Sequence, residues 1–342
     1  MALTSEQRER YSRTLALRDF GENEMASVLK ATVSVVGAGG LGSPALRLLV
    51  AMGFGKVRII DRDIVELSNI QRQTVYNTRD IGRPKAEAAA SNLALMNPDV
   101  EFEPITVSID MNNAQKLLKG SDIILDGLDT VQSRRAVNSA SVRLKIPYVF
   151  AGAIEYYANI TTFLPGQTGC LQCMMGDVQD NPENTCQTVG VSPMLLPVAA
   201  SVEVQEAVLI AVNRHPRLAG RLMAIDMNDL AFDFFDIGRV EGCPVCSAPT
   251  KRAPEKHDSP TVTMLCSGSF NISPAGPTAI DTSAVARRAR GKHKTVERPG
   301  FVRIETDTGV QITIMQSGNA IVKGVSTSSQ ALHLYQETLS GL

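Results

Sequence analysis

The feature that most constrains this sequence is a glycine motif between an apolar strand and an apolar helix. Gly37, Gly39 and Gly42 form the pattern GxGxxG. Residues 31–36 before it are apolar and β-branched, which predicts a buried strand, and residues 44–52 after it predict a helix. In this context the glycines allow a tight turn, close approach of the backbone to a phosphate, and close packing of helix on sheet. The motif therefore predicts a nucleotide-binding turn at the carboxyl end of a buried strand in a parallel sheet.

Strand and helix patterns continue to alternate as far as residue 150. Strands are predicted at 57–60, 101–107, 123–125 and 148–150, and helices at 84–96, 114–119 and 133–145. Parallel strands need crossover connections, so this alternation predicts a mainly parallel sheet with helices on both faces. The expected fold class is α/β, with a Rossmann-like domain over residues 1–247.

The second half of the chain predicts a long loop, a linker and a small domain. Residues 165–193 hold glycine, proline and three cysteines, which favours a functional loop. A helix is expected at 197–213, and prolines among charged residues indicate a linker at 248–260. The remainder, 261–342, is expected to be a small α+β domain. Its predicted strands are 261–265, 301–306, 310–315 and 320–325, and its predicted helices are 278–290 and 328–339.

Composition restricts the class of protein. Of 342 residues, 44% are hydrophobic, and 34 Lys and Arg against 35 Asp and Glu leave a net charge of -1. This balance of charges does not indicate a strongly basic surface, so nucleic acid is not an expected partner. Pro197, Glu203 and Glu206 interrupt the longest apolar run, which argues against a membrane span, and residues 1–10 lack the apolar core of a secretion signal. The expected compartment is the cytoplasm.

An acidic residue and several cations follow the glycine motif. Asp61 ends the second predicted strand, where a carboxylate can accept hydrogen bonds from ribose hydroxyls. These features alone permit an NAD-dependent oxidoreductase, which stays open as an alternative. Arg72 and Lys85 favour a triphosphate, because its larger negative charge must be neutralised for attack at phosphorus. The sequence lacks the Walker A lysine motif, which excludes a P-loop enzyme.

Five separated motifs occur in one order: RYSR at 10–13, VVGAGGLGSP at 35–44, SNIQRQ at 68–73, GRPK at 82–85 and DGLD at 126–129. Together they resemble the ThiF/MoeB/HesA family, the homodimeric relatives of ubiquitin-activating enzymes. The resemblance covers about residues 5–247. It implies adenylation of the C-terminal glycine of a ubiquitin-like or sulfur-carrier protein ending in Gly-Gly, by a homodimer that uses ATP and Mg²⁺.

The resemblance assigns nucleotide contacts to individual residues. Those expected to line the adenine nucleotide are Gly37, Gly39, Gly40 and Gly42. Asp61 would hold the ribose, and Asn69, Arg72 and Lys85 match positions that contact phosphates. Arg72 and Lys85 thereby enter the expected catalytic set.

Two further residues are expected to be catalytic but do not belong to this set of phosphate-contacting residues. Asp129 matches the acidic residue that helps to bind magnesium, although Thr130 follows it where the family often has asparagine. Arg13 matches an arginine that reaches the nucleotide of the partner subunit. Its role therefore requires a dimer.

Four of the six cysteines form two CxxC pairs, Cys170 with Cys173 and Cys243 with Cys246. Two such pairs fit a tetrahedral site in which thiolates fill every position, so they predict structural Zn²⁺. Unpaired buried thiols are the alternative, and a redox CxxC would leave the second pair unexplained. In the resembling family this zinc pins the crossover loop to the end of the adenylation domain.

Cys186 lies between the two pairs and matches the family's crossover-loop cysteine. A thiolate there can attack the adenylate to form a thioester or join a persulfide exchange, whereas a lone cysteine can also be a small buried hydrophobe. Cys266 follows an apolar strand and is expected to be packed.

Four questions of function stay open at this point. Thiamin or molybdopterin sulfur-carrier activation without thioester transfer competes with protein conjugation, and a non-catalytic adaptor is a further alternative. A tRNA-modifying relative that adenylates a small-molecule or base carboxamide also stays open. The C-terminal domain either recruits a partner, such as a conjugating enzyme or a sulfurtransferase, through its sheet face or serves as a stabilising appendage.

Overall fold

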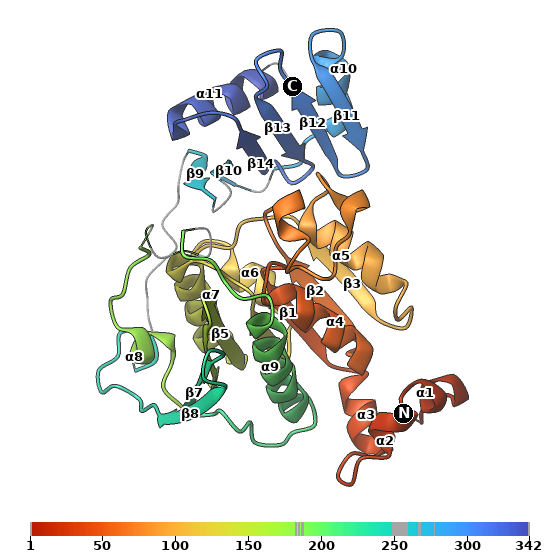
Figure 1. The fold of residues 1–342 in the computed structure, drawn as a ribbon, viewed down its shortest axis with the longest axis vertical. Helices are drawn as coiled ribbons and strands as arrows, with labels where there is room; N and C mark the ends of the chain where they lie inside the picture. The colour runs from red at the N-terminus through yellow and green to blue at the C-terminus, as the bar shows by residue number, and fades with distance from the viewer. Residues whose placement is uncertain are drawn as a thin grey trace.

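The computed structural model describes residues 2–181, 183, 185, 188–247, 259–265, 268–276 and 278–340. These residues form an eight-stranded sheet and a six-stranded sheet in two separate parts of the chain (Figure 1). Most of the expected linker and both Cys186 and Cys266 lie outside the described residues.

The large sheet has the strand order β3-β2-β1-β4-β5-β6-β7-β8. Its strands are β1 (Thr32–Val36), β2 (Lys56–Ile60), β3 (Glu101–Ile105), β4 (Ile123–Asp126), β5 (Tyr148–Ile154), β6 (Tyr157–Phe163), β7 (Arg221–Asp226) and β8 (Ala231–Asp236). Strands β1 to β5 pair in parallel, and β6, β7 and β8 continue the sheet in antiparallel order. The predicted α/β class with a mainly parallel sheet is confirmed.

Helices cover both faces of this sheet. They are α1 (Ser5–Arg10), α2 (Ser12–Leu15), α3 (Glu22–Val28), α4 (Gly42–Met52), α5 (Lys85–Ala94), α6 (Ala114–Leu118), α7 (Val131–Leu144), α8 (Leu171–Met175) and α9 (Leu195–Ala211), with short 3₁₀ turns η1 (Leu67–Asn69) and η2 (Thr78–Asp80). One core joins the strands to α3, α4, α5 and α9, and a second joins them to α6, α7 and α8. Burial on both faces explains why these strands read as continuous apolar runs.

The C-terminal domain is an antiparallel sheet of order β11-β12-β13-β14-β10-β9. Its elements are β9 (Thr261–Met264), β10 (Phe270–Ser273), α10 (Thr282–Ala289), β11 (Lys294–Arg298), β12 (Phe301–Glu305), β13 (Gln311–Met315), β14 (Ala320–Lys323) and α11 (Ser328–Leu339). Both helices pack on one face of the sheet. The sequence reasoning missed β10 and β11, because β10 is short and β11 is a polar edge strand that has no apolar alternation.

The domain lies beside the end of the large sheet that carries β2, β3 and α5 (Figure 1). In the part of the chain that the structure describes, no helix has the length and apolar character needed to cross a membrane. The expected loop at 165–193 contains one short helix, α8, which begins directly after Cys170.

Candidate functional site

The glycine motif forms the turn from β1 into α4, and it packs against the end of β4. Gly37 has a φ of 94°, and a Cβ built on it would lie 2.2 Å from the carbonyl oxygen of Gly127. A Cβ on Gly42 would lie 1.8 Å from the carbonyl oxygen of Gly37. Backbone therefore meets backbone here, which only glycine permits. Gly39 and Gly40 lie in the same turn, as the motif predicts.

Asp61 follows β2 and holds the glycine turn in place. Its carboxylate accepts hydrogen bonds from the backbone N–H of Ala38 at 2.6 Å and of Asp63 at 2.7 Å. The residue is only 9% exposed, and burial raises the pKa of its carboxyl above the ordinary value although Lys85 acts in the opposite direction. The structure thus places Asp61 beside the glycine turn, where the sequence expects a ribose contact.

Lys85 lies at the start of α5 and forms a nearly buried ion pair. Its Nζ lies 3.0 Å from Oδ2 of Asp63, and the exposed fractions of the two side chains are 7% and 29%. Burial alone would lower the pKa of Lys85, but the carboxylates around it, chiefly Asp63 and Asp61, raise it. Lys85 therefore remains a cation at neutral pH.

The segment that contains η1 carries two side-chain amides, Asn69 and Gln73, and the guanidinium of Arg72, and Gln73 lies beside the glycine turn. Asn69 is buried, and its Oδ1 accepts the backbone N–H of Glu66 at 3.0 Å. Gln73 is 3% exposed, and its Oε1 has no hydrogen-bond partner among the described residues. Its Nε2 lies 3.8 Å from the Cβ that would be built on Gly39. Arg72 is partly exposed and donates from Nη1 to the carbonyl oxygen of Ser68 at 2.9 Å.

Asp129 lies in the loop after β4, and a buried network supports that loop. Asp129 itself is exposed, and its charge contributes to the raised pKa of Lys85. Arg134 in α7 binds Asp126 at 3.1 Å and donates to the carbonyl oxygen of Leu128 at 2.7 Å. Tyr148 donates a hydrogen bond to the same Asp126 carboxylate. The buried Arg134–Asp126 ion pair and the bond from Arg134 to Leu128 therefore hold the loop that carries Asp129.

Arg13 does not join these residues within one subunit. It lies exposed on α2 next to Tyr11, and the Tyr11 hydroxyl oxygen would be 2.3 Å from a Cβ on Gly53. Gly53 caps the C-terminal end of α4, whereas the glycine motif forms its N-terminal end. The 11 residues of α4 separate these ends by about 16 Å at 1.5 Å per residue. Figure 1 shows α2 on the side of the domain remote from the glycine turn.

The four paired cysteines form a compact cluster. The Sγ atoms of Cys170, Cys173, Cys243 and Cys246 all lie within 4.8 Å of one another. Cys170 and Cys243 are 3.8 Å apart, and Cys173 and Cys246 are 3.5 Å apart. A tetrahedral site with Zn–S bonds of about 2.3 Å requires sulfur atoms about 3.8 Å apart. The cluster therefore fits the predicted Cys₄ zinc site.

The four thiols differ in their surroundings: burial raises the pKa of Cys170, and burial together with hydrogen bonding to Cys173 raises that of Cys246. Burial acts to raise the pKa of Cys243, but the backbone N–H groups of Cys246 and Val245 outweigh it and lower the pKa to about 7. Thiolates are the metal-binding form of cysteine. The cluster joins α8 to the turn after β8, so a metal there would anchor one end of the crossover loop.

Described residues on both sides of Cys186 contact the large domain, one at the start of α7 and the other directly after β5. The Asp180 carboxylate accepts the backbone N–H groups of Val131 and Gln132, at 2.6 and 3.2 Å, at the start of α7. On the other side, the carbonyl oxygen of Gly190 accepts the N–H of Glu155 at 2.9 Å. The crossover loop is thus held at two points near the end of the parallel strands.

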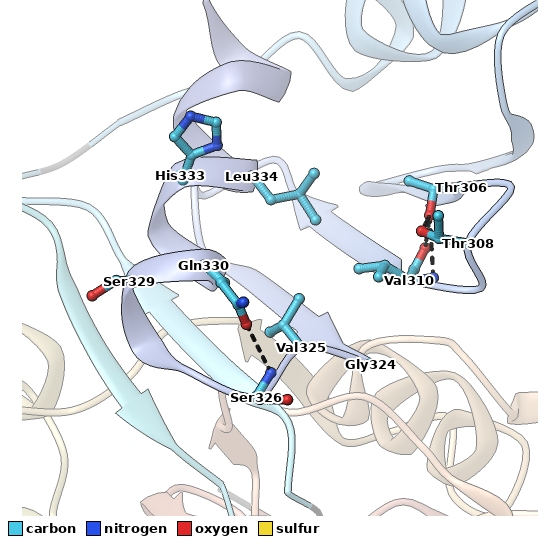
Figure 2. A pocket seen from close by; sticks show the side chains of 10 residues that line it. All are labelled: Thr306, Thr308, Val310, Gly324, Val325, Ser326, Ser329, Gln330, His333 and Leu334. Atoms are coloured by element: carbon cyan, nitrogen blue, oxygen red, sulfur yellow. Dashed lines mark hydrogen bonds between the residues drawn. The ribbon is translucent and has the colours of Figure 1, made fainter.

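A pocket of about 600 Å³ lies elsewhere, in the C-terminal domain between α11 and the turn after β12 (Figure 2). Threonine, serine, valine and leucine side chains, together with Gln330 and His333, line it, and no lysine, arginine or carboxylate is among its lining residues. This pocket does not match a phosphate-bearing ligand, which needs countercharges.

A comparison of the sequence with known families agrees with this geometry. The profile of the ThiF family matches residues 11–245. The chain belongs to the ThiF family. The resemblance seen in the sequence is confirmed, and the matched range ends between the second pair of cysteines.

Two ThiF relatives differ in how much of this chain they match. The "SAMP-activating enzyme E1" of Haloferax volcanii is 33% identical over 247 residues, which cover 72% of this chain and 91% of that protein. The "Sulfur carrier protein ThiS adenylyltransferase" of Bacillus subtilis is 27% identical over 333 residues, which cover 96% of this chain and 98% of that protein. The second similarity extends through the C-terminal domain.

A solved structure shows the same fold. The crystal structure of E. coli MccB with succinimide superimposes with a TM-score of 0.63 at 24% identity, over 72% of this chain and 75% of that one.

Sequence reasoning missed several members of this candidate site. Asp63, Gln73, Asp126 and Arg134 are buried or half-buried around it. Asp126 ends a predicted strand, as Asp61 does, and that shared position is a signal that could have identified it. Nothing in the local pattern indicates that Asp63 pairs with Lys85, which lies 22 residues away.

Proposed function

We propose that this chain uses ATP to adenylate the C-terminal glycine of a ubiquitin-like or sulfur-carrier protein. The observation that carries the proposal is that Lys85, Asn69 and Gln73 lie together beside the glycine turn. Asp61 binds the backbone of the same turn. The names of the relatives, which include a SAMP-activating enzyme and ThiS adenylyltransferases, support the same activity.

In the proposed reaction a carboxylate oxygen of the carrier attacks the α-phosphorus of ATP. The bond from that phosphorus to the bridging oxygen breaks, and pyrophosphate leaves with the electron pair. Arg72 and Lys85 supply positive charge for the two anions that must meet, and the glycine turn supplies backbone N–H groups. The product is a mixed anhydride that an acceptor can attack.

Asp129 is the residue that would hold Mg²⁺, because an exposed carboxylate is a hard oxygen ligand. The ion would add countercharge to the phosphates. The four-cysteine cluster would hold Zn²⁺ in a structural role, with thiolates in all four positions.

The main test is ATP–pyrophosphate exchange with a carrier protein that ends in Gly-Gly. Exchange should require the carrier, and Asp129→Ala should lose it, whereas Asp307→Ala, an exposed carboxylate of the C-terminal domain, should retain it. Exchange that is unchanged in Asp129→Ala would refute the assignment. Parallel titrations with ATP and NAD test the oxidoreductase alternative, which predicts that NAD binds more tightly.

We further propose that Arg13 acts on the nucleotide of a partner subunit in a homodimer. The separation of Arg13 from the glycine turn within one subunit supports this. Mixing Arg13→Ala with Lys85→Met, each inactive alone, should restore about a quarter of wild-type exchange, because half of the randomly mixed dimers hold one intact site. No recovery after verified subunit exchange would contradict action in trans.

The fate of the adenylate is proposed to be attack by the Cys186 thiolate on the glycine carbonyl, with AMP as leaving group. The contact of Asp180 with the start of α7, two residues after Asp129, supports this step. It predicts a covalent adduct that Cys186→Ala abolishes, and intact mass separates a thioester from an acyl disulfide by one sulfur atom. An adenylate without any adduct would favour sulfur-carrier activation without thioester transfer.

A further inference from the structure

The C-terminal domain contacts the segment that carries the phosphate-binding residues. Residues 63–66 and 82–85 run beside each other, with hydrogen bonds from Val65 N–H to the Arg83 carbonyl at 2.9 Å and from Gly82 N–H to the Val65 carbonyl at 2.8 Å. Lys85 N–H also donates to the Asp63 carbonyl at 2.8 Å. We name this paired segment the phosphate hairpin. One side of it presents the Asp63–Lys85 ion pair.

Apolar contact connects this hairpin to the C-terminal sheet. Ile64, which pairs with Pro84, packs against a buried cluster from β12, β13, β14 and the end of β9. The cluster consists of Leu265, Phe301, Met315 and Ile321. The neighbours of Ile64 in sequence are Asp63, which pairs with Lys85, and Val65, which is buried. The same short stretch therefore faces the candidate ATP site and the C-terminal domain.

Polar and close contacts flank the apolar one. Lys323 in β14 forms an ion pair with Glu66 at 3.2 Å, and the Glu66 N–H binds the Asn69 side chain. A Cβ on Gly82 would lie 2.3 Å from Nη1 of Arg303, and one on Gly300 would lie 2.6 Å from Oε1 of Glu87. The two parts of the chain are thus in contact on both strands of the hairpin.

A third contact lies at the neighbouring strand. Ser317 Oγ and Asn319 Nδ2 both donate to the carbonyl oxygen of Thr106, which follows β3, at 2.8 and 3.0 Å. The sequence predicts the sheet face of this domain as one candidate surface for recruiting a partner. The structure shows that Met315 and Ile321 on it are buried, with exposed fractions of 0% and 3%.

From these contacts we infer that the C-terminal domain is a positioning element of the ATP site, with Ile64, Glu66 and Lys323 as its positioning residues. A ligand that binds one conformation of a segment is weakened when that conformation is less populated, so contacts that restrain the segment strengthen binding. The domain holds the hairpin in the arrangement that presents Lys85 to phosphate, and Glu66 of the hairpin binds the Asn69 side chain. The inference rests on the proposed use of ATP.

The contact predicts a specific kinetic signature. If Ile64→Ser lowers the population of the competent hairpin, the KM for ATP rises about tenfold while kcat at saturating ATP stays within about twofold, because ATP restores the same bound state. Ile81→Ser is the matched control, since Ile81 directly precedes the second strand of the hairpin and is 38% exposed. It should leave both constants unchanged.

A charge exchange separates positioning from general stability. Lys323→Glu and Glu66→Lys should each raise the KM for ATP about two- to fivefold, the range of a partly exposed ion pair, and the double variant should return it toward wild type. Lys294→Glu alters a lysine of the same domain that is 76% exposed, and it serves as the control. Absence of rescue in the double variant would overturn the role of this pair.

Hydrogen exchange of the ligand-free full chain tests the inference without ATP. Amides of residues 61–87 should exchange faster in Ile64→Ser than in wild type, while amides of 301–315 keep their protection and thereby show that the C-terminal domain is folded. Unchanged exchange at 61–87 would overturn the positioning role. Wild-type protein that binds no ATP would instead refute the proposed function and leave this measurement valid.

Discussion

Replacement of Lys85 by methionine tests whether the buried ion pair serves both folding and phosphate binding. Methionine keeps much of the side-chain length and removes the charge, which leaves Asp63 and Asp61 close together without their common cation. Burial acts to raise the pKa of Asp63, but Lys85 and Arg62 outweigh it and lower the pKa. The variant should therefore be less stable and inactive, for two separable reasons.

The expected loss of stability follows from how far the Asp63 side chain is exposed to water. Loss of one member of a fully buried pair costs about 3–5 kcal/mol, and because water reaches Asp63 we expect about 2–3 kcal/mol here. Lys85→Met/Asp63→Asn should recover most of this free energy of unfolding, because no uncompensated carboxylate remains at position 63. Loss of a preorganised countercharge should lower ATP–pyrophosphate exchange by about 10²–10³-fold in both variants.

Urea unfolding and exchange assays on the same preparations distinguish the two effects, with the exposed Lys119→Met as control. Because the folded pKa of Asp63 is lowered, its stabilising contribution is present above the ordinary carboxyl pKa of about 3.9 and disappears as pH falls through the folded value. The stability difference between wild type and Lys85→Met should shrink accordingly below about pH 4. Equal stability at pH 7, or recovery of exchange in the double variant, would refute this reasoning.

Three further outcomes are expected. Burial raises the pKa of the Glu203 carboxyl well above its usual range. Urea unfolding at pH 5, 6 and 7 should show wild type losing up to about 1.4 kcal/mol per pH unit relative to Glu203→Gln, until the folded pKa is passed; parallel pH profiles would contradict this. Elemental analysis should find about one zinc per chain in wild type and much less in Cys243→Ser, whereas an unchanged zinc content in the variant would argue against the Cys₄ site. Gly42→Ala should cost about 3 kcal/mol in urea and lose ATP binding, because its Cβ meets backbone, while Gly238→Ala, which has open space, should do neither.

Much of the ThiF-family domain could be predicted from the sequence, because its signals are local. The glycine turn requires its own residue types at adjacent positions, and strands buried on both faces are continuous apolar runs. The CxxC pairs indicated a metal site, since each pair brings two ligands close together whatever the remaining fold. The sequence missed β11 because its residues, Lys294–Arg298, are largely polar and its partner strand rather than its own pattern makes it a strand.

The sequence by itself determined the α/β class, the glycine turn with Asp61 at the next strand end, and the four-cysteine set. Only the tertiary structure decided that Asp63 pairs with Lys85, that Arg134 supports the loop of Asp129, and that the C-terminal sheet packs on Ile64. The physical reason is that these contacts join residues far apart in the chain. Their energies depend on burial and on the charges around them, which periodicity and spacing do not encode, whereas turns, strands and paired ligands depend mainly on neighbours in sequence.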